Sequence, residues 1–308
     1  MRLGRTDLTV SPIGLGADHF GTTINQEDSF AILDAFLDAG GNFIDTAHVY
    51  GAWIKGAGNR SEQVIGKWLA KRDHRHLIVA TKGGHYDLHA PSLPRLSKAE
   101  IWQDMEMSLR TLGLDCLPLY WLHRDDLTRP IEEIIETMEA FKKAGYIMHY
   151  GASNYTAKRL YQALAFANAC GVEGFVAVSN QYSPLKLNAG QNTNQDPTLV
   201  LTGEDELRFH EQTKTPLVPF QFTGKGYFSK LSQNLPISPA LVRAYQNPHN
   251  ERLYQDYKEK AELMCCSMQT ITLSTMPKLC PFPLIPLTSV KRTEDMADIA
   301  EAIDILSR

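Results

Sequence analysis

Short apolar segments alternate with longer amphipathic segments along the whole chain. Eight short runs are rich in apolar or β-branched residues, which favours strands. These runs cover residues 12–16, 42–45, 77–82, 117–123, 147–153, 174–181, 215–221 and 284–287. Several of these runs are almost wholly apolar, as are strands that are covered on both faces of a sheet.

Between these runs, apolar residues recur every three or four positions, which predicts helices. Such patterns run through residues 30–37, 64–69, 101–112, 131–141, 160–164, 254–264 and 296–303. Ser61 is expected to cap the second helix, and Ser97 with Glu100 has the spacing of a capping box before the third. Pro130 stands where a fourth helix would begin.

The repeated order of strand then helix predicts an α/β fold with a parallel sheet closed on itself, a (β/α)8 barrel formed by residues 1–308 as a single domain. An open doubly wound sheet is the main alternative. It would begin with three spaced glycines, and Gly14 and Gly16 have no third glycine at the required place. The long connections, residues 83–96, 182–203 and 222–249, all follow strands and would lie on one rim. The most polar stretch, residues 188–196, is expected to be a solvated loop.

Composition narrows the classes of partner. The 31 basic and 35 acidic residues give a formal charge of −4, which argues against a nucleic-acid partner. No apolar run approaches the roughly 18 residues of a membrane span, and the N-terminal residues lack the layout of a signal peptide. The 5 cysteines have no C-x-x-C spacing and fit reduced thiols, so we expect a cytoplasmic location. These features leave the oligomeric state open.

Polar residues end several of the predicted strands and suggest chemistry. Asp45, Lys82 and His123 end the second, third and fourth strands, and Tyr50 follows Asp45 by five positions. Because the ends of neighbouring parallel strands lie close together, Lys82 and Asp45 are expected to pair. The ammonium would then lower the pKa of Tyr50 toward neutrality and make it a general acid. Such a site suits hydride transfer to a carbonyl, and the hydride would come from a cofactor.

The motifs around these residues carry a resemblance. GGNFIDTAHVYG, NRSEQVIGKWL, VATKGG, LYWLHRDD, GASNYT and NQYSPL follow one another in the order found in the aldo-keto reductase family, a family of (β/α)8 barrels that reduce carbonyls with NAD(P)H. The resemblance implies that Tyr50 is the general acid, that Lys82 and Asp45 tune it, and that His123 orients the carbonyl.

The same resemblance implies a cofactor site. Ser153, Asn154 and Gln181 would hold the nicotinamide carboxamide, and Phe220 would lie against the nicotinamide ring. The remaining residues at the family's cofactor positions are Ala17, Asp45, Gln221, Ser289, Lys291, Arg292 and Asp295. Lys291 and Arg292 favour NADP(H), with NAD(H) as the alternative.

The chain departs from the family at the far end of this cofactor site. Phe220-Gln221 replaces a common tyrosine-serine pair, Ser289 replaces a glycine or lysine, and Ile299 stands at the last position of a glutamate-asparagine pair.

Further polar and aromatic residues on the same rim are candidates for the substrate pocket. They are Asp18, His19, Phe20, Trp53, His85 and Tyr86. Their polarity suits a sugar or another hydroxylated carbonyl. No helical pair of histidines or cysteine pair accompanies them, so no metal site is expected.

Two other functions remain open at this point. A lyase or aldolase would use Lys82 as a Schiff-base nucleophile. A non-catalytic, nucleotide-binding regulatory subunit would keep the fold without the turnover.

Overall fold

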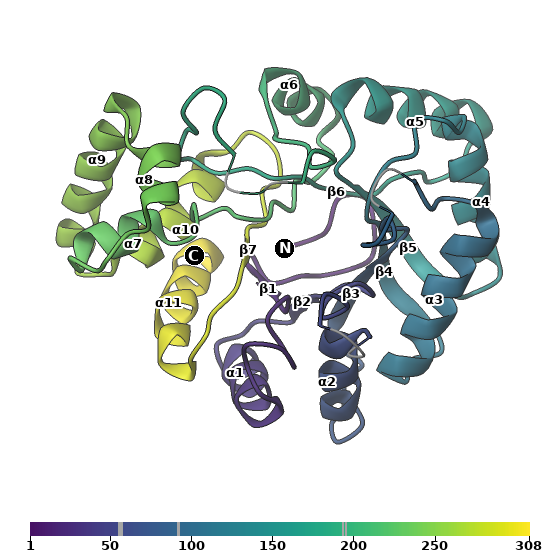
Figure 1. Cartoon of the computed structure of the whole chain (residues 1–308), viewed down its shortest axis with the longest axis horizontal. Helices are drawn as coiled ribbons and strands as arrows, with labels where there is room; N and C mark the ends of the chain where they lie inside the picture. The colour runs from purple at the N-terminus through teal and green to yellow at the C-terminus, as the bar shows by residue number, and fades with distance from the viewer. Residues whose placement is uncertain (55–57, 91–92, 193, 195) are drawn as a thin grey trace.

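The computed structural model describes residues 1–54, 58–90, 93–192, 194 and 196–308. Its centre is a parallel sheet in the order β6-β5-β4-β3-β2-β1-β7, with the helices arranged around it (Figure 1). The strands are β1 (Gly14–Gly16), β2 (Phe43–Asp45), β3 (Ile78–Gly83), β4 (Leu117–Leu122), β5 (Ile147–Ser153), β6 (Val178–Ser179) and β7 (Leu287–Thr288). The predicted (β/α)8 barrel is confirmed.

Residues 215–221, predicted as the seventh strand, close the barrel between β6 and β7. Leu217 bridges both Val178 and Leu284. The Val218 amide donates to the Val178 carbonyl at 2.7 Å, and the Leu217 amide donates to the Pro283 carbonyl at 2.9 Å. Proline has no N–H, so the prolines at 216, 219, 283 and 286 interrupt this ladder. The closure is therefore a backbone ladder that lacks donors at its prolines and is held by the remaining amides, including those of Leu217, Val218 and Phe220.

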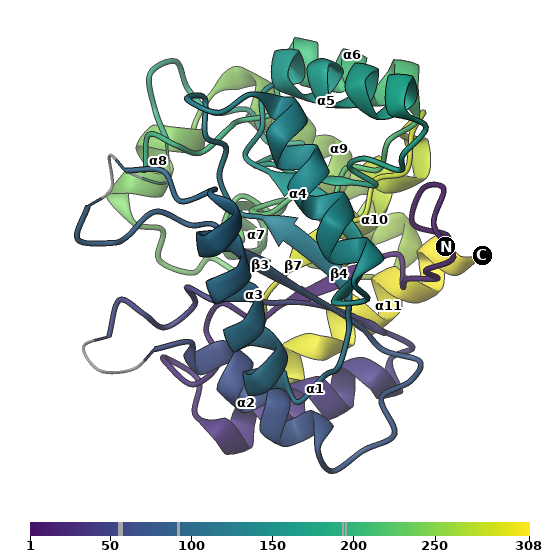
Figure 2. The same cartoon turned by 90° about the vertical axis from the view of Figure 1, so that its right-hand side faces the viewer.

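The helices surround this sheet, and α2, α3 and α4 cover its outer face (Figure 2). They are α1 (Gln26–Asp38), α2 (Arg60–Leu69), α3 (Lys98–Leu112), α4 (Ile131–Lys143), α5 (Ala157–Cys170), α6 (Glu204–Thr213), α7 (Tyr227–Ser232), α8 (Pro239–Tyr245), α9 (Pro248–Met264), α10 (Met268–Leu279) and α11 (Met296–Ser307). None of the helices in the described ranges has the length and apolar character needed to cross a bilayer.

The predicted caps have mixed outcomes. The Ser97–Glu100 capping box is present at the start of α3. The prediction that Ser61 caps α2 is wrong, because the N-cap position is Asn59. The Ser61 hydroxyl instead lies within 2.7 Å of both the Ala17 carbonyl and the Thr46 hydroxyl. It thereby ties α2 to the ends of β1 and β2.

The N-terminal residues form a small hairpin against one end of the barrel. Leu3 donates its amide to the Leu8 carbonyl at 2.9 Å, and both side chains are buried in a cluster that includes Phe43 and Trp121. His149 on β5 holds this hairpin from outside: its Nε2 lies 2.8 Å from Asp7 Oδ1. The other ring nitrogen, Nδ1, lies 2.9 Å from a carboxylate oxygen of Glu173.

This contact predicts a pH-dependent contribution to stability. Burial lowers the pKa of His149, but its hydrogen bonds to Glu173 and Asp7 outweigh burial and raise the pKa above the usual 6.5. A raised histidine pKa stabilises the fold below about pH 6.5, and the stabilisation is lost as pH rises through the folded-state pKa. We expect His149→Gln to cost about 0.5–1 kcal/mol of unfolding free energy at pH 6 and less at pH 9.

Urea unfolding at the two pH values measures this difference. His76, which is exposed, provides the control variant His76→Gln. Equal effects of His149→Gln at pH 6 and pH 9 would contradict the prediction.

Candidate active site

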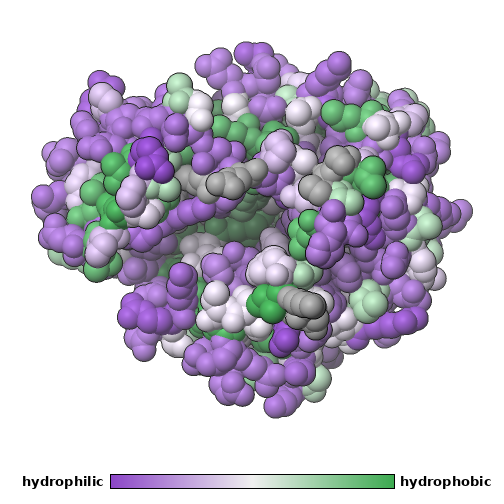
Figure 3. Space-filling model, in the orientation of Figure 1, coloured by the Kyte–Doolittle hydropathy of each residue, from purple (hydrophilic) through white to green (hydrophobic). Residues whose placement is uncertain are grey.

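The carboxyl ends of four adjacent strands supply the polar floor of one pocket. Asp45, Lys82 and Ser153 lie at the ends of β2, β3 and β5, and His123 directly follows β4. The pocket has a volume of about 210 Å³. The molecular surface is hollowed near the centre of the face seen in Figure 1 (Figure 3). The sequence prediction that these strand ends meet is thus consistent with the structure.

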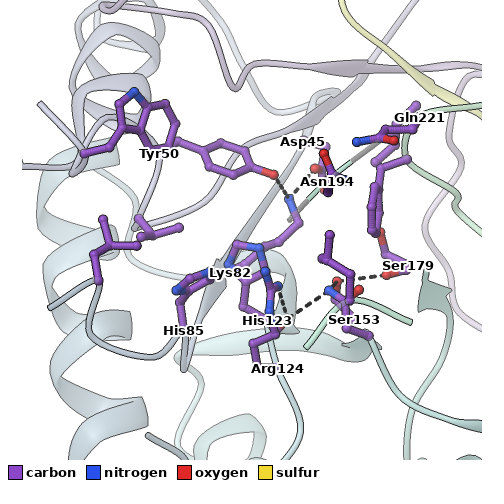
Figure 4. Close-up of a pocket in the computed structure, with 17 residues that line it drawn as sticks. Asp45, Tyr50, Lys82, His85, His123, Arg124, Ser153, Ser179, Asn194 and Gln221 are labelled. Atoms are coloured by element: carbon purple, nitrogen blue, oxygen red, sulfur yellow. Dashed lines mark hydrogen bonds and ion pairs between the residues drawn. The ribbon is translucent and has the colours of Figure 1, made fainter. Parts of the chain in front are cut away.

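Lys82 is the centre of the charged group in this pocket. Its Nζ pairs with Asp45 Oδ1, donates to the Thr46 carbonyl at 2.8 Å and donates to Tyr50 Oη at 3.3 Å (Figure 4). Lys82 is 3% exposed and Asp45 is 2% exposed. A buried charge is tolerated when it is paired and hydrogen-bonded, and this pair meets that condition. The arrangement leaves the ammonium beside the tyrosine hydroxyl.

The expectation that Tyr50 has a pKa near neutrality is wrong in direction. Burial raises the pKa of Tyr50 above the usual 10, and the Lys82 ammonium offsets this only in part. The negative charges of Asp45 and Asp18 add to the increase. Tyr50 is therefore protonated at neutral pH, which is the form that can give up a proton.

His123 lies beside Tyr50 as a neutral imidazole. Its ring meets the Tyr50 ring edge-on, with centroids 6.0 Å apart. Burial, together with the charges of Arg124 and Lys82, holds the pKa of His123 well below its usual 6.5. A neutral imidazole has one N–H donor and one acceptor nitrogen. His123 can therefore donate a hydrogen bond to a substrate oxygen without placing a second positive charge beside Lys82.

The predicted carboxamide-binding residues form the wall on the β5–β6 side. Ser153 Oγ donates to the Ser179 carbonyl at 2.8 Å. Asn154 Nδ2 donates to the His123 carbonyl at 3.2 Å, and Asn154 Oδ1 accepts from the Val200 amide at 3.2 Å. Both side chains line the pocket. Gln181 is buried and bridges Phe220 through the backbone, but it is not among the residues that line the pocket.

Ser179 is a residue of this wall that sequence reasoning missed. Its Oγ is buried and has no hydrogen-bond partner in the part of the chain that the structure describes. Ser179 is the last residue of β6, so its place at a strand end, like those of Asp45 and Ser153, could have identified it. An unpaired buried hydroxyl in the pocket wall fits a polar group such as a carboxamide.

The residues predicted for the rest of the cofactor site lie in different parts of the structure. Phe220 and Gln221 line the pocket. Ser289 Oγ donates to Asp18 Oδ1 at 2.9 Å, and Arg292 pairs with Asp295 at 2.6 Å. Lys291 is exposed, whereas Ala17 is fully buried in the core and offers only backbone atoms.

The predicted substrate residues divide into three groups. Trp53 and His85 line the pocket, and Tyr86 packs against His85. Asp18 and His19 lie at the Ser289 side, outside the pocket lining. Phe20 was predicted to line the pocket and does not, because its side chain is 1% exposed within the core. Besides Ser179, the pocket-lining residues that sequence reasoning missed are Val49, Leu88, Arg124, Asn194, Leu199 and Leu287.

The sequence of this chain is similar to those of several known proteins. The chain is 35% identical over 198 residues to the uncharacterized oxidoreductase YrpG of Bacillus subtilis, covering 61% of this chain and 59% of the relative. It is 31% identical over 194 residues to an aryl-alcohol dehydrogenase [NADP(+)] of Phanerodontia chrysosporium, covering 57% and 49%. It is 30% identical over 187 residues to a probable voltage-gated potassium channel subunit beta of Oryza sativa subsp. japonica, covering 59% and 54%.

These matches span about half to three fifths of the relatives' own lengths. A family model covers far more of the chain. The model of the Aldo/keto reductase family matches residues 12–307, which include every strand of the barrel and all four polar residues of the pocket floor. The chain therefore belongs to the aldo/keto reductase family.

Proposed function

We propose that this protein is an NAD(P)H-dependent oxidoreductase that reduces an aldehyde or ketone to the alcohol, or catalyses the reverse reaction. The observation that carries the proposal is the contact of Lys82 with both Asp45 and Tyr50, beside a neutral His123 in one pocket. These groups can polarise a carbonyl and protonate its oxygen. The nicotinamide cofactor would supply the hydride.

Tyr50 and three residues of the pocket floor, Asp45, Lys82 and His123, each have a distinct part in this mechanism. His123 donates a hydrogen bond to the carbonyl oxygen and orients it. Tyr50 donates its proton to the same oxygen as negative charge develops there. The Lys82 ammonium stabilises the resulting tyrosinate, and Asp45 keeps that ammonium charged and in place. In the direction of alcohol oxidation, the tyrosinate would accept the proton.

The residues of the β5–β6 wall fit the carboxamide end of the cofactor. Ser153, Asn154 and Ser179 present polar groups to the pocket, and Phe220 offers an aromatic face. Gln181, which does not itself line the pocket, would also help to bind the carboxamide. Beyond it, we propose that Lys291 and Arg292 bind the 2′-phosphate of NADP(H), and that Ala17, Gln221, Ser289 and Asp295 contact other parts of the nucleotide; NAD(H) is the alternative.

Replacement of Arg292 tests this cofactor preference. Arg292 is exposed and pairs with Asp295, which lies three positions further along the chain. A 2′-phosphate could therefore replace that carboxylate as the partner of Arg292. We expect Arg292→Ala to weaken NADPH binding about tenfold, the effect of losing one charge-assisted hydrogen bond, and to leave NADH binding unchanged. Titration of tryptophan fluorescence measures both affinities.

The control for this experiment is Arg308→Ala. Arg308 is also exposed and pairs with a nearby carboxylate, Asp304, near the C-terminus. Equal losses of NADPH and NADH affinity in Arg292→Ala would reject the phosphate contact.

A direct assay tests the proposed function itself. NADPH and NADH are each mixed with the protein and with a panel of simple aldehydes, ketones and sugars, and nucleotide oxidation is followed by absorbance. Turnover of a carbonyl supports the proposal. Nucleotide binding without turnover over the whole panel would instead support a non-catalytic regulatory subunit.

The Schiff-base alternative has little support at Lys82. A nucleophilic amine must lose its proton, and burial alone would lower the lysine pKa. Here the charge of Asp45, together with the hydrogen bonds to Asp45 and Tyr50, outweighs burial and raises the pKa of Lys82 above its usual value. Lys82 is therefore a stable ammonium, suited to an electrostatic part and not to covalent attack.

A further inference from the structure

His85 stands next to His123 in the pocket wall and has no part in the mechanism above. The centroids of the two imidazole rings are 4.8 Å apart, and the rings meet edge-on. On its other side His85 packs against Tyr86, with centroids 4.1 Å apart. His85 also lines the pocket, so it is beside the position where His123 would hold the carbonyl oxygen (Figure 4).

The hydrogen bonds of His85 determine which ring nitrogen is an acceptor. Nδ1 lies 2.9 Å from the Tyr86 carbonyl, which can only accept, so Nδ1 carries the hydrogen. Burial and the Arg124 guanidinium lower the pKa of His85 to about 4, so the ring is neutral at pH 7. Nε2 is then an unprotonated acceptor, and it has no hydrogen-bond partner within the described ranges.

A partly buried ionic contact holds this part of the wall. Tyr86 Oη donates to Asp196 Oδ2 at 2.9 Å, and Arg124 Nη2 donates to the same oxygen at 2.7 Å. Arg124 Nε donates to Thr198 Oγ1 at 2.7 Å. These contacts join three segments: the one after β3, the one after β4 and the one before α6. They fix the backbone beside His85.

Arg124 also lines the pocket, but its hydrogen bonds are directed at the protein. Besides Asp196 and Thr198, it binds the His123 carbonyl through Nη1 at 2.8 Å. Every nitrogen of the guanidinium thus has a protein partner. Arg124 is therefore a structural cation, and a substrate carboxylate would have to displace Asp196 to bind it. The ligand group best matched to this wall is a neutral hydrogen-bond donor facing His85.

We propose that His85 determines substrate specificity by accepting a hydrogen bond from a hydroxyl group on the carbon next to the carbonyl. The substrate class is then 2-hydroxyaldehydes and 2-hydroxyketones. This inference rests on the proposed carbonyl reduction: two adjacent imidazoles would bind the two adjacent oxygens of such a substrate, His123 as donor and His85 as acceptor. A substrate without the hydroxyl leaves the His85 acceptor unsatisfied.

Three aldehydes of equal chain length test the inference. They are propanal, 2-hydroxypropanal (both enantiomers) and 3-hydroxypropanal, each assayed with NADPH and with NADH. In the unmodified protein we expect the highest kcat/KM for one enantiomer of 2-hydroxypropanal. In His85→Phe, which keeps an aromatic ring but removes the acceptor, the ratio of kcat/KM for 2-hydroxypropanal to that for propanal is expected to fall about tenfold.

A conservative variant separates hydrogen bonding from packing. His85→Asn restores an acceptor oxygen, so part of the preference should return. Circular dichroism and nucleotide-induced quenching show whether each variant folds, and His85→Ala replaces His85→Phe if the larger ring prevents folding.

The outcomes of this test are distinct. Equal kcat/KM for propanal and 2-hydroxypropanal in the unmodified protein would overturn the inference while leaving carbonyl reduction intact. An unchanged ratio in His85→Phe would do the same. Failure to reduce any carbonyl on the wider panel would overturn the proposed function, and the inference with it.

Discussion

Tyr50→Phe is expected to lower kcat about 10²–10⁴-fold, the range of a general acid, while nucleotide affinity stays unchanged. The reason is that Tyr50 is the proton donor of the proposed mechanism, with Oη 3.3 Å from Lys82 Nζ. Phenylalanine keeps the ring against His123 but removes the proton. Steady-state kinetics give kcat, and fluorescence quenching gives the nucleotide affinity.

The control for this variant is Tyr161→Phe. The Tyr161 hydroxyl is on the surface, where it donates to Gln212 at 2.7 Å. Tyr161→Phe also removes a phenolic oxygen, but from a residue that does not line the pocket. Its kcat should therefore equal that of the unmodified protein. Full activity in Tyr50→Phe would show that another group donates the proton, and the mechanism proposed here would be incorrect.

Lys82→Met is expected to abolish turnover and also to destabilise the fold by about 3–5 kcal/mol. The loss of stability follows because Asp45 is 2% exposed and would lose the partner that compensates its charge. The loss of turnover follows because, in the proposed mechanism, the Lys82 ammonium stabilises the tyrosinate of Tyr50. Urea unfolding measures the first effect, and the carbonyl assay measures the second.

The double variant Lys82→Met with Asp45→Asn separates these two effects. Removing the carboxylate removes the unpaired charge, so a large part of the lost stability should return. Activity should stay absent, because the ammonium is still missing. If the double variant were as unstable as Lys82→Met, the buried charge of Asp45 would not be the cause.

The placement of the candidate site was largely predictable because parallel strands end at one rim. Asp45, Lys82 and His123 each follow an apolar run, and the barrel brings them together. The pKa of Tyr50 was not predictable, since its direction depends on how completely the surrounding residues exclude water. The position of Asp196 was not predictable either. Its segment looks solvated by composition, yet Asp196 pairs with Arg124 from a distant strand end.

The fold, like the site, was predictable from the sequence only in part. Amphipathic spacing identified α1 to α5, α9 and α11, but it missed four helices of the second half. Helix α6 is polar along much of its length, and only Phe209 and His210 are buried. Helices α7 and α8 are too short for a periodic pattern. Helix α10 buries a continuous run, residues 270–274, and contains Pro277, so it has neither a clear polar face nor an unbroken helical sequence.

The proline-interrupted closure of the barrel gives the two walls of the pocket unequal stiffness. On the side of β2, β3 and β4, consecutive residues pair along each strand, and the Asp45–Lys82 contact stands on this regular ladder. On the opposite side, Phe220 and Gln221 end a segment that contains Pro216 and Pro219, which have no N–H to donate, so this side has fewer backbone hydrogen bonds. Regions with fewer backbone hydrogen bonds open at lower free-energy cost. A bulky nucleotide could therefore enter and leave by local breathing of the Phe220 wall, while the proton-transfer groups keep their geometry.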